Sequence, residues 1–135
     1  MPTPSSSHLE GWVAIVDDDE SIRRSIARVL RVNDIAVRTF SSAEEYLSRS
    51  SSEEPGCLVL DVHLKGLSGF ELKERLDAEG KTTPIIFITA LDEITSEHLE
   101  SRAGPNSYLR KPFETSLLLV RVRQHLAAST EALKQ

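Results

Sequence analysis

Apolar residues gather in five short runs along the chain, and most of these runs are followed by a longer stretch with a different rhythm. The run "CLVLD" is apolar without alternation and is bounded by turn residues, which is typical of a central parallel strand covered on both faces. "WVAIV" and "PIIFIT" also resemble buried strands, and "IAVRTF" and "SYLR" complete the set. We therefore predict five strands, over residues 12–16, 35–40, 57–61, 84–89 and 107–110.

The stretches between and after these runs predict helices. In the stretch 17–32, apolar residues recur at i, i+4, i+7 and i+8, the spacing of a helix with one buried face, at Ile22, Ile26, Val29 and Leu30. Further helices are predicted over residues 41–49, 70–79, 93–104 and 114–128. The helix over 93–104 is poorly amphipathic because "TSE" interrupts its apolar stripe, which predicts shallow docking.

Polar residues at the starts of three helices indicate how each is capped. Asp19 and Glu20 suit the N-terminus of the first helix, where acidic side chains interact favourably with the helix dipole. The second and third helices have the spacing of a capping box, in which two side chains satisfy free amides reciprocally. These pairs are Ser42 with Glu45 and Ser68 with Glu71.

Strict alternation of strands and helices predicts a parallel sheet between two helix layers, since parallel neighbours need crossover connections. A chain of 135 residues with 39% hydrophobic residues has the size of one domain with one core. We expect this domain over residues 12–128. Residues 1–11, rich in Pro and Ser, predict a flexible leader, and residues 129–135 a tail or the start of a linker.

The overall charge narrows the possible partners. A net charge of −5 and a pI near 5.4 argue against a free-standing nucleic-acid binder, so any DNA contact needs another module.

Cys57 is the single cysteine, and its apolar neighbours suggest a buried thiol of a reducing compartment. Neither a signal peptide nor an apolar run long enough for a membrane is found, which predicts a cytoplasmic protein without a membrane partner.

Polar residues stand at the carboxyl ends of the predicted strands, where parallel sheets bind ligands. They are Asp17, Asp18, Asp61, Thr89 and Lys111. Three converging carboxylates repel, so a divalent cation is the natural counter-charge, and an oxygen-only set favours Mg²⁺. The lysine charge and the threonine hydroxyl suit the oxygens of a phosphoryl group.

Asp61 is the best candidate nucleophile, because no serine or cysteine with a partnered histidine occurs at these ends. Each residue also has a simpler interpretation when taken alone. The acidic run could serve only as a helix start, and a strand-end Asp or Thr only as a turn residue. It is the joint occurrence of all five at one edge that favours a site.

At this point the chain resembles the receiver domain of two-component response regulators over residues 12–128. The resemblance rests on "IVDDDE", "LVLDVHLKGLSGFEL", "PIIFITAL" and "YLRKPF". The separations also agree with the family, at 43 residues from Asp18 to Asp61, 28 from Asp61 to Thr89 and 22 from Thr89 to Lys111. The resemblance implies a flavodoxin-like, doubly wound (βα)5 fold, with strand order 2-1-3-4-5 and helices on both faces.

The resemblance further implies a chemistry. Asp61 accepts a phosphoryl group from a sensor histidine kinase, and Mg²⁺ is held by Asp18, Asp61, the backbone carbonyl of His63 and, through water, Asp17. Lys111 binds a phosphoryl oxygen and precedes a cis peptide bond to Pro112. Such a protein is a switch that catalyses its own phosphotransfer and dephosphorylation, not a turnover enzyme.

The resemblance also implies how the signal leaves the site. Thr89 moves toward the phosphoryl group and Tyr108 swings inward to fill the space, a population shift between two packings. The face formed by the fourth helix (93–104), the fifth strand and the fifth helix then contacts an output domain or a downstream protein. A homodimer through the last helices is compatible with this, and DNA binding belongs to a C-terminal domain that this chain does not show.

Lys65 and Pro105 depart from the family pattern, which usually has proline and a small residue at these positions. The side chain of His63, two positions after Asp61, either lies beside the phosphoryl group or is a solvated bystander. Two other functions stay open. A haloacid-dehalogenase-like phosphohydrolase also uses a strand-end Asp with Mg²⁺, but it needs a second Asp at the position of His63. The last alternative is a receiver-like interaction module that is never phosphorylated.

Overall fold

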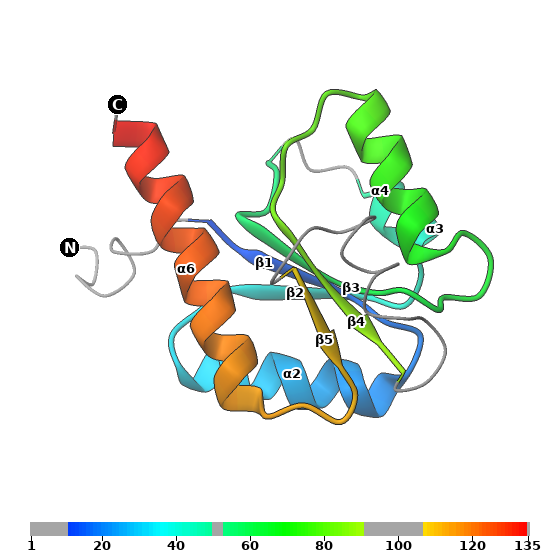
Figure 1. Ribbon diagram of the computed structural model, residues 1–135, viewed down its shortest axis with the longest axis horizontal. Helices are drawn as coiled ribbons and strands as arrows, with labels where there is room; N and C mark the ends of the chain where they lie inside the picture. Colours follow the sequence, from blue (N-terminus) through cyan, green and yellow to red (C-terminus); the bar gives the residue numbers. More distant parts are fainter. Residues whose placement is uncertain (1–10, 50–52, 91–106, 135) are drawn as a thin grey trace.

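The computed structural model describes residues 11–49, 53–90 and 107–134, with only the backbone described from residue 129 onward. The predicted helix over 93–104, Pro105 and nearly all of the leader 1–11 lie outside the described residues. All five predicted strands are present and form one parallel sheet (Figure 1). They are β1 (Val13–Val16), β2 (Val37–Phe40), β3 (Cys57–Asp61), β4 (Ile85–Thr89) and β5 (Tyr108–Arg110).

The strand order is β2-β1-β3-β4-β5, which confirms the order that the resemblance implied. β1 pairs with both β2 and β3, so the direction of winding reverses at the β1–β3 pair. Val16 is opposite Leu60 in this pair, and the residues that follow them therefore emerge side by side at the carboxyl edge. In a doubly wound sheet this point of reversal is where ligands bind.

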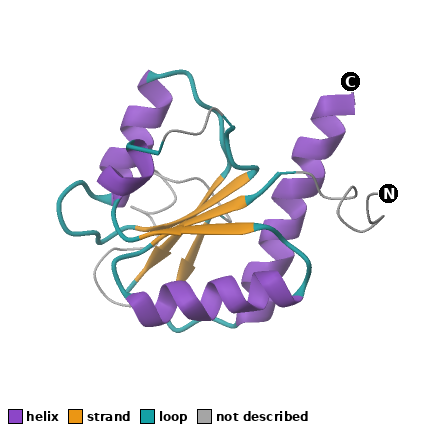
Figure 2. Cartoon of the chain, turned by 180° about the vertical axis from the view of Figure 1, so that it is seen from behind, coloured by secondary structure: helices purple, strands orange, loops and turns teal. Residues whose placement is uncertain are grey.

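Helices cover both faces of the sheet, as predicted (Figure 2). α2 (Glu20–Val32) and α6 (Thr115–Lys134) pack on one face, and α3 (Ala43–Leu47) and α4 (Gly69–Ala78) pack on the other. Side chains of a strand alternate between the faces, so Val13 and Ile15 of β1 join the first layer while Ala14 and Val16 join the second. The central strands β1 and β3 are buried over their full length.

The helices α2 and α4 are capped at their N-termini as predicted, whereas α3 differs in part. The Asp19 side chain caps α2 by accepting from the amides of Ser21 and Ile22, at 2.9 and 3.3 Å. At α4 the capping box is complete, and its two side-chain bonds join Ser68 and Glu71.

The predicted capping box of α3 is only half correct. Ser42 accepts from the Glu45 amide at 3.0 Å, as expected. The Glu45 carboxylate, however, turns one residue further back, because Ser41 offers both its amide and its hydroxyl, at 2.6 and 3.0 Å. Two donors on one residue thus hold the glutamate away from the Ser42 amide.

The last helix is longer than predicted. α6 continues to Lys134, whereas the sequence pattern placed its end at residue 128. Residues 129–134 contain neither glycine nor proline, so no local signal stops the helix there.

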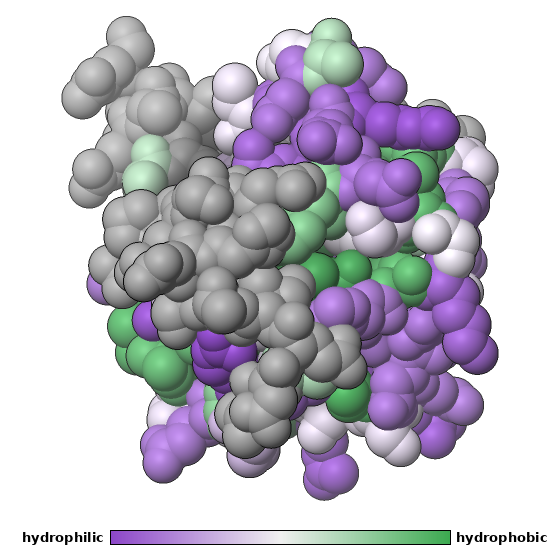
Figure 3. Space-filling model, turned by 45° about the vertical axis from the view of Figure 1, so that its right-hand side comes forward, coloured by the Kyte–Doolittle hydropathy of each residue, from purple (hydrophilic) through white to green (hydrophobic). Residues whose placement is uncertain are grey.

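The surface and interior of the described residues are clearly separated. Among the described residues, large apolar side chains are exposed only at Val32, Leu117 and Val120. On the face shown in Figure 3, hydrophilic residues form most of the described surface, with small apolar areas between them. Cys57 is a free, fully buried thiol, as predicted, and burial raises its pKa to about 12. No helix in the described part of the chain has the length and apolar character to cross a membrane.

Candidate functional site at the carboxyl edge of the sheet

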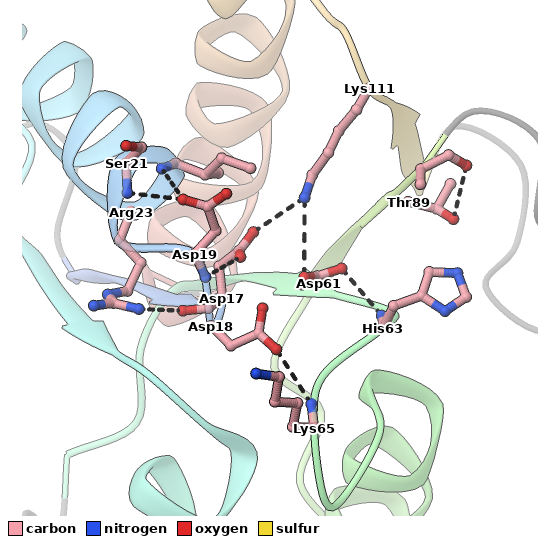
Figure 4. A network of polar contacts seen from close by, with 12 residues as sticks. Asp17, Asp18, Asp19, Ser21, Arg23, Asp61, His63, Lys65, Thr89 and Lys111 are labelled. Atoms are coloured by element: carbon pink, nitrogen blue, oxygen red, sulfur yellow. Dashed lines mark hydrogen bonds and ion pairs between the residues drawn. The ribbon is translucent and has the colours of Figure 1, made fainter.

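Three carboxylates converge where the winding reverses. Asp17 and Asp18 follow β1, Asp61 ends β3, and one oxygen from each lies within 4.8 Å of the others (Figure 4). The β1–β3 register explains the convergence, because pairing of Val16 with Leu60 places the next residues of both strands at the same edge. The sequence prediction that these three residues meet is therefore correct in geometry.

Two of these carboxylates are buried. Asp17 is 1% exposed and Asp61 is 5% exposed, whereas Asp18 lies at the surface. The pKa of Asp17 is raised to about 6, first by burial and then by the nearby charge of Asp61, although the Asp19 amide and Lys111 act in the opposite direction. The protein thus holds a carboxylate where ionisation is costly.

Lys111 supplies one positive charge to this group. Its Nζ lies 3.4 Å from Asp17 Oδ2 and 3.9 Å from Asp61 Oδ2, so the ammonium sits between the two buried carboxylates. Lys111 follows β5, its amide donates to the Thr89 carbonyl at 2.8 Å, and the peptide bond to Pro112 is cis, as the resemblance implied. Within the described residues, no other cationic side chain is at ion-pair distance from these carboxylates.

Backbone amides orient each of the carboxylates. The amide of Asp19 donates to Asp17 Oδ1 at 2.9 Å and that of His63 to Asp61 Oδ1 at 3.0 Å. The amide of Lys65 donates to Asp18 Oδ2 at 3.3 Å, from a loop 47 residues further along the chain. Each side chain is therefore held in one direction, and the three point toward one another in Figure 4.

The donor set fits a hard divalent cation. Three carboxylates with one lysine leave an excess of negative charge in a partly buried cluster, and every available ligand atom is oxygen. Mg²⁺ prefers such ligands and leaves coordination positions for water and a phosphoryl group.

Comparison with known proteins identifies the family. The model of the response regulator receiver domain matches residues 13–123. The chain belongs to this family. The predicted resemblance is thereby confirmed, and this receiver domain is a part of two-component signalling systems.

Relatives of the receiver domain include transcriptional regulators. The chain is 32% identical to the transcriptional regulatory protein FixJ of Azorhizobium caulinodans, over 91% of this chain and 58% of that protein. It is 35% identical to the transcriptional regulatory protein TdiR of Thauera aromatica, over 88% of this chain and 52% of that protein. The chain thus spans little more than half the length of these curated relatives.

Solved structures show the same fold. The response regulator StyR aligns with a TM-score of 0.80 at 37% identity, covering 93% of this chain and 64% of StyR. The receiver protein from Burkholderia phymatum aligns with a TM-score of 0.73 at 40% identity, covering 87% of this chain and 95% of that one. The flavodoxin-like fold predicted from the sequence is therefore confirmed.

The remaining predicted residues of the receiver domain lie around the carboxylates. Thr89 ends β4, is fully buried, and donates its hydroxyl to the Ala90 carbonyl at 3.3 Å instead of to Asp61. Figure 4 shows this pair to one side of the carboxylates. Tyr108 begins β5, is half-buried, and packs against the apolar cluster under α3 and α4. The His63 side chain is exposed, and only its backbone amide reaches Asp61.

Two supporting residues were not predicted. Arg23 Nη1 donates to the Asp17 carbonyl at 2.7 Å, from the first turns of α2. The Lys65 amide, noted above, reaches Asp18, although only the side chain of Lys65 drew attention in the sequence. A backbone donor carries no residue-specific signal, so the pattern of residue types did not point to it.

Proposed function

We propose that the receiver domain accepts a phosphoryl group from a sensor histidine kinase onto Asp61. The observation that supports this most is the placement of the buried Asp61 carboxylate beside Asp17, Asp18 and the Lys111 ammonium. In the transfer, the P–N bond of a phosphohistidine breaks and an Asp61 oxygen–phosphorus bond forms. The product is an acyl phosphate, and the imidazole leaves with its electron pair and takes up a proton.

In this proposal each residue around Asp61 has a role. The His63 amide holds Asp61 Oδ1, which leaves Oδ2, on the Lys111 side, as the attacking atom. Lys111 neutralises a phosphoryl oxygen during the transfer. Asp18, Asp61 and the His63 carbonyl would hold Mg²⁺, and Asp17 would act through water. When bound, the ion neutralises charge on the transferring phosphoryl group.

The proposal extends to the response that follows. The Thr89 hydroxyl exchanges the Ala90 carbonyl for a phosphoryl oxygen, and Tyr108 moves inward. The surface that changes comprises β5, α6 and residues 93–104. Of these three segments, only 93–104 lies outside the described residues. This surface contacts an output domain or a downstream protein in the cytoplasm, and can support a homodimer. DNA binding would require another domain.

The direct test is labelling with acetyl phosphate. Wild-type protein is expected to incorporate one phosphoryl group in the presence of Mg²⁺, and EDTA or Asp61→Asn is expected to abolish the label. Asp77→Asn, an exposed acid on α4, is the matched control and retains full labelling. Folded wild type that takes no label with Mg²⁺ would favour an interaction module, and steady hydrolysis of phosphomonoesters would favour a phosphohydrolase.

A further inference from the structure

The loop between β3 and α4, residues 62–68, supplies two of the amides that hold the carboxylates. These are the His63 amide on Asp61 and the Lys65 amide on Asp18. The loop contains no proline, and Gly66 in its middle adopts a φ of +77°, a conformation open mainly to glycine. Backbone hydrogen bonds hold the ends of the loop at Val62 and Gly69, and contacts from outside can hold its middle.

One such contact comes from α3, on the far side of the loop. Glu44 Oε2 accepts a hydrogen bond from the Leu67 amide at 2.9 Å, across 23 residues of sequence. The same oxygen lies so close to Gly66 that a Cβ there would approach it to 2.7 Å. Glu44 thus touches the loop at two successive residues, directly after the Lys65 amide that reaches Asp18.

Glu44 belongs to α3, a short helix that is packed against the core. Ala43 and Tyr46 of α3 are fully buried, and the Tyr46 ring packs edge-on against Phe40 with centroids 5.2 Å apart. Ser42 caps the helix. The hydrogen bond from Leu67 is also the main reason why the pKa of Glu44 lies below its ordinary value. The carboxylate is therefore presented to the loop by a short, well-packed helix.

We propose that Glu44 is a positioning residue, which clamps the loop 62–68 so that its amides hold Asp18 and Asp61 in the geometry that binds Mg²⁺. This inference rests on the function proposed above. Glu44 touches neither the metal nor the phosphoryl group. It acts through the backbone of Gly66 and Leu67, as outer-shell partners of metal ligands commonly do.

A simpler role for Glu44 makes a different prediction. An acid in the first turn of α3 also interacts favourably with the helix dipole through its charge. Glu44→Gln removes this charge but keeps an oxygen that can accept from the Leu67 amide, whereas Glu44→Ala removes both. Comparison of the two variants therefore separates the clamp from the dipole.

The experiment measures Mg²⁺ affinity by calorimetry and hydrogen exchange at the Leu67 amide by NMR. Glu44→Ala is expected to weaken Mg²⁺ binding about 10-fold and to speed exchange at Leu67, whereas Glu44→Gln stays close to wild type in both. Glu45→Gln, the neighbouring acid that bonds to Ser41 instead of the loop, is the control and changes neither. Gly66→Ala, which strains the loop backbone at a φ of +77° and also approaches Glu44 Oε2, is expected to weaken Mg²⁺ binding as Glu44→Ala does.

The outcomes distinguish the two proposals. If wild type binds Mg²⁺ and Glu44→Ala binds it equally well, the clamp is wrong and the proposed function is unaffected. Equal loss of affinity in Glu44→Ala and Glu44→Gln assigns the effect to the dipole and also overturns the clamp. A wild type that binds no Mg²⁺ overturns both.

Discussion

Two groups of charged side chains lie at opposite ends of the sheet, and they are built on opposite principles. At the amino ends of the strands, Glu54 accepts from Arg49 Nη2 at 2.9 Å and from Lys81 Nζ at 3.0 Å. The Arg49 guanidinium also stacks 4.0 Å from the centroid of the Tyr46 ring. At the carboxyl ends, three carboxylates share the single ammonium of Lys111.

The difference is one of charge balance. The amino-end group places two cations around one carboxylate, and we call it balanced because each oxygen of Glu54 has a cationic partner, although its formal charge is +1. Among the described residues, the carboxyl-end group keeps an excess of negative charge that a bound cation would balance. Removing one partner of a largely buried ion pair costs stability because the other charge is left without a partner, whereas carboxylates that crowd together with too few cations lower stability and mark a candidate binding site.

The largest expected effect comes from removing the lone cation of the carboxyl-end group. We expect Lys111→Ala to slow phosphoryl labelling by acetyl phosphate about 100-fold, because a preorganised charge facing the transferred group is lost. Lys81→Ala, at the other end of the sheet, is the matched control and should label at the wild-type rate. Equal labelling rates in wild type and Lys111→Ala would remove Lys111 from the proposed transfer.

Removing a cation from the balanced group should instead affect folding. Arg49→Met keeps an unbranched stem over the Tyr46 ring but leaves Glu54 with Lys81 alone. The Arg49 side chain is only 9% exposed, so we expect a loss of about 2 kcal/mol in the free energy of unfolding in urea. Mg²⁺ affinity should stay unchanged. A variant as stable as wild type would show that this pairing does not stabilise the fold.

The raised pKa of Asp17 predicts that removing this charge raises the stability of the fold, in contrast to the loss expected for Arg49→Met, and that the gain depends on pH. In the folded protein without metal this pKa is about 6, above its ordinary value of 3.8, which we take for the unfolded chain. Between these values the folded state binds the extra proton, so Asp17 lowers stability as pH rises and does so fully above pH 6.

Asp17→Asn should therefore stabilise the metal-free protein by about 2–3 kcal/mol at pH 7, with most of the gain lost near pH 4. Urea unfolding in EDTA at both pH values measures this. Added Mg²⁺ should stabilise wild type more than Asp17→Asn at pH 7, because the ion balances the charge that the variant lacks. A constant difference between the proteins across this pH range would contradict the assigned cause.

These contrasts also show which features the sequence could predict. The five apolar runs predicted every strand in the described residues. The signal was clearest for β1, β3 and β4, because a strand buried on both faces needs an uninterrupted apolar segment. The sequence also predicted that Asp17, Asp61 and Lys111 lie close together, since the carboxyl ends of parallel strands meet at one edge of the sheet. The excess of carboxylates over cations at this edge then indicated a metal site.

The contacts that complete the site were beyond such reasoning. The bond from Leu67 to Glu44 joins residues whose types and spacing carry no motif, and it depends on where α3 docks. The amino-end group was missed for the same reason, because Arg49 and Glu54 come from the connection between α3 and β3 whereas Lys81 comes from the one between α4 and β4. The end of α6 was misplaced because no residue there forbids a helix. The spacing of apolar and polar residues predicts strands and helices, whereas contacts between distant segments depend on how those elements pack against one another.

The smallest expected effect concerns the outer half of the balanced group. Lys81 and Glu54 are each about one-third exposed, so water and salt screen their attraction. We expect Lys81→Met to lower the free energy of unfolding by about 0.5 kcal/mol at low salt and by less in 1 M NaCl. Lys73→Met, which breaks the exposed pair with Asp77 on α4, sets the scale for an ordinary helix pair of about 0.3–0.5 kcal/mol. Because Arg49 still neutralises Glu54 in Lys81→Met, a loss as large as that of Arg49→Met would mean that the two cations act as one unit.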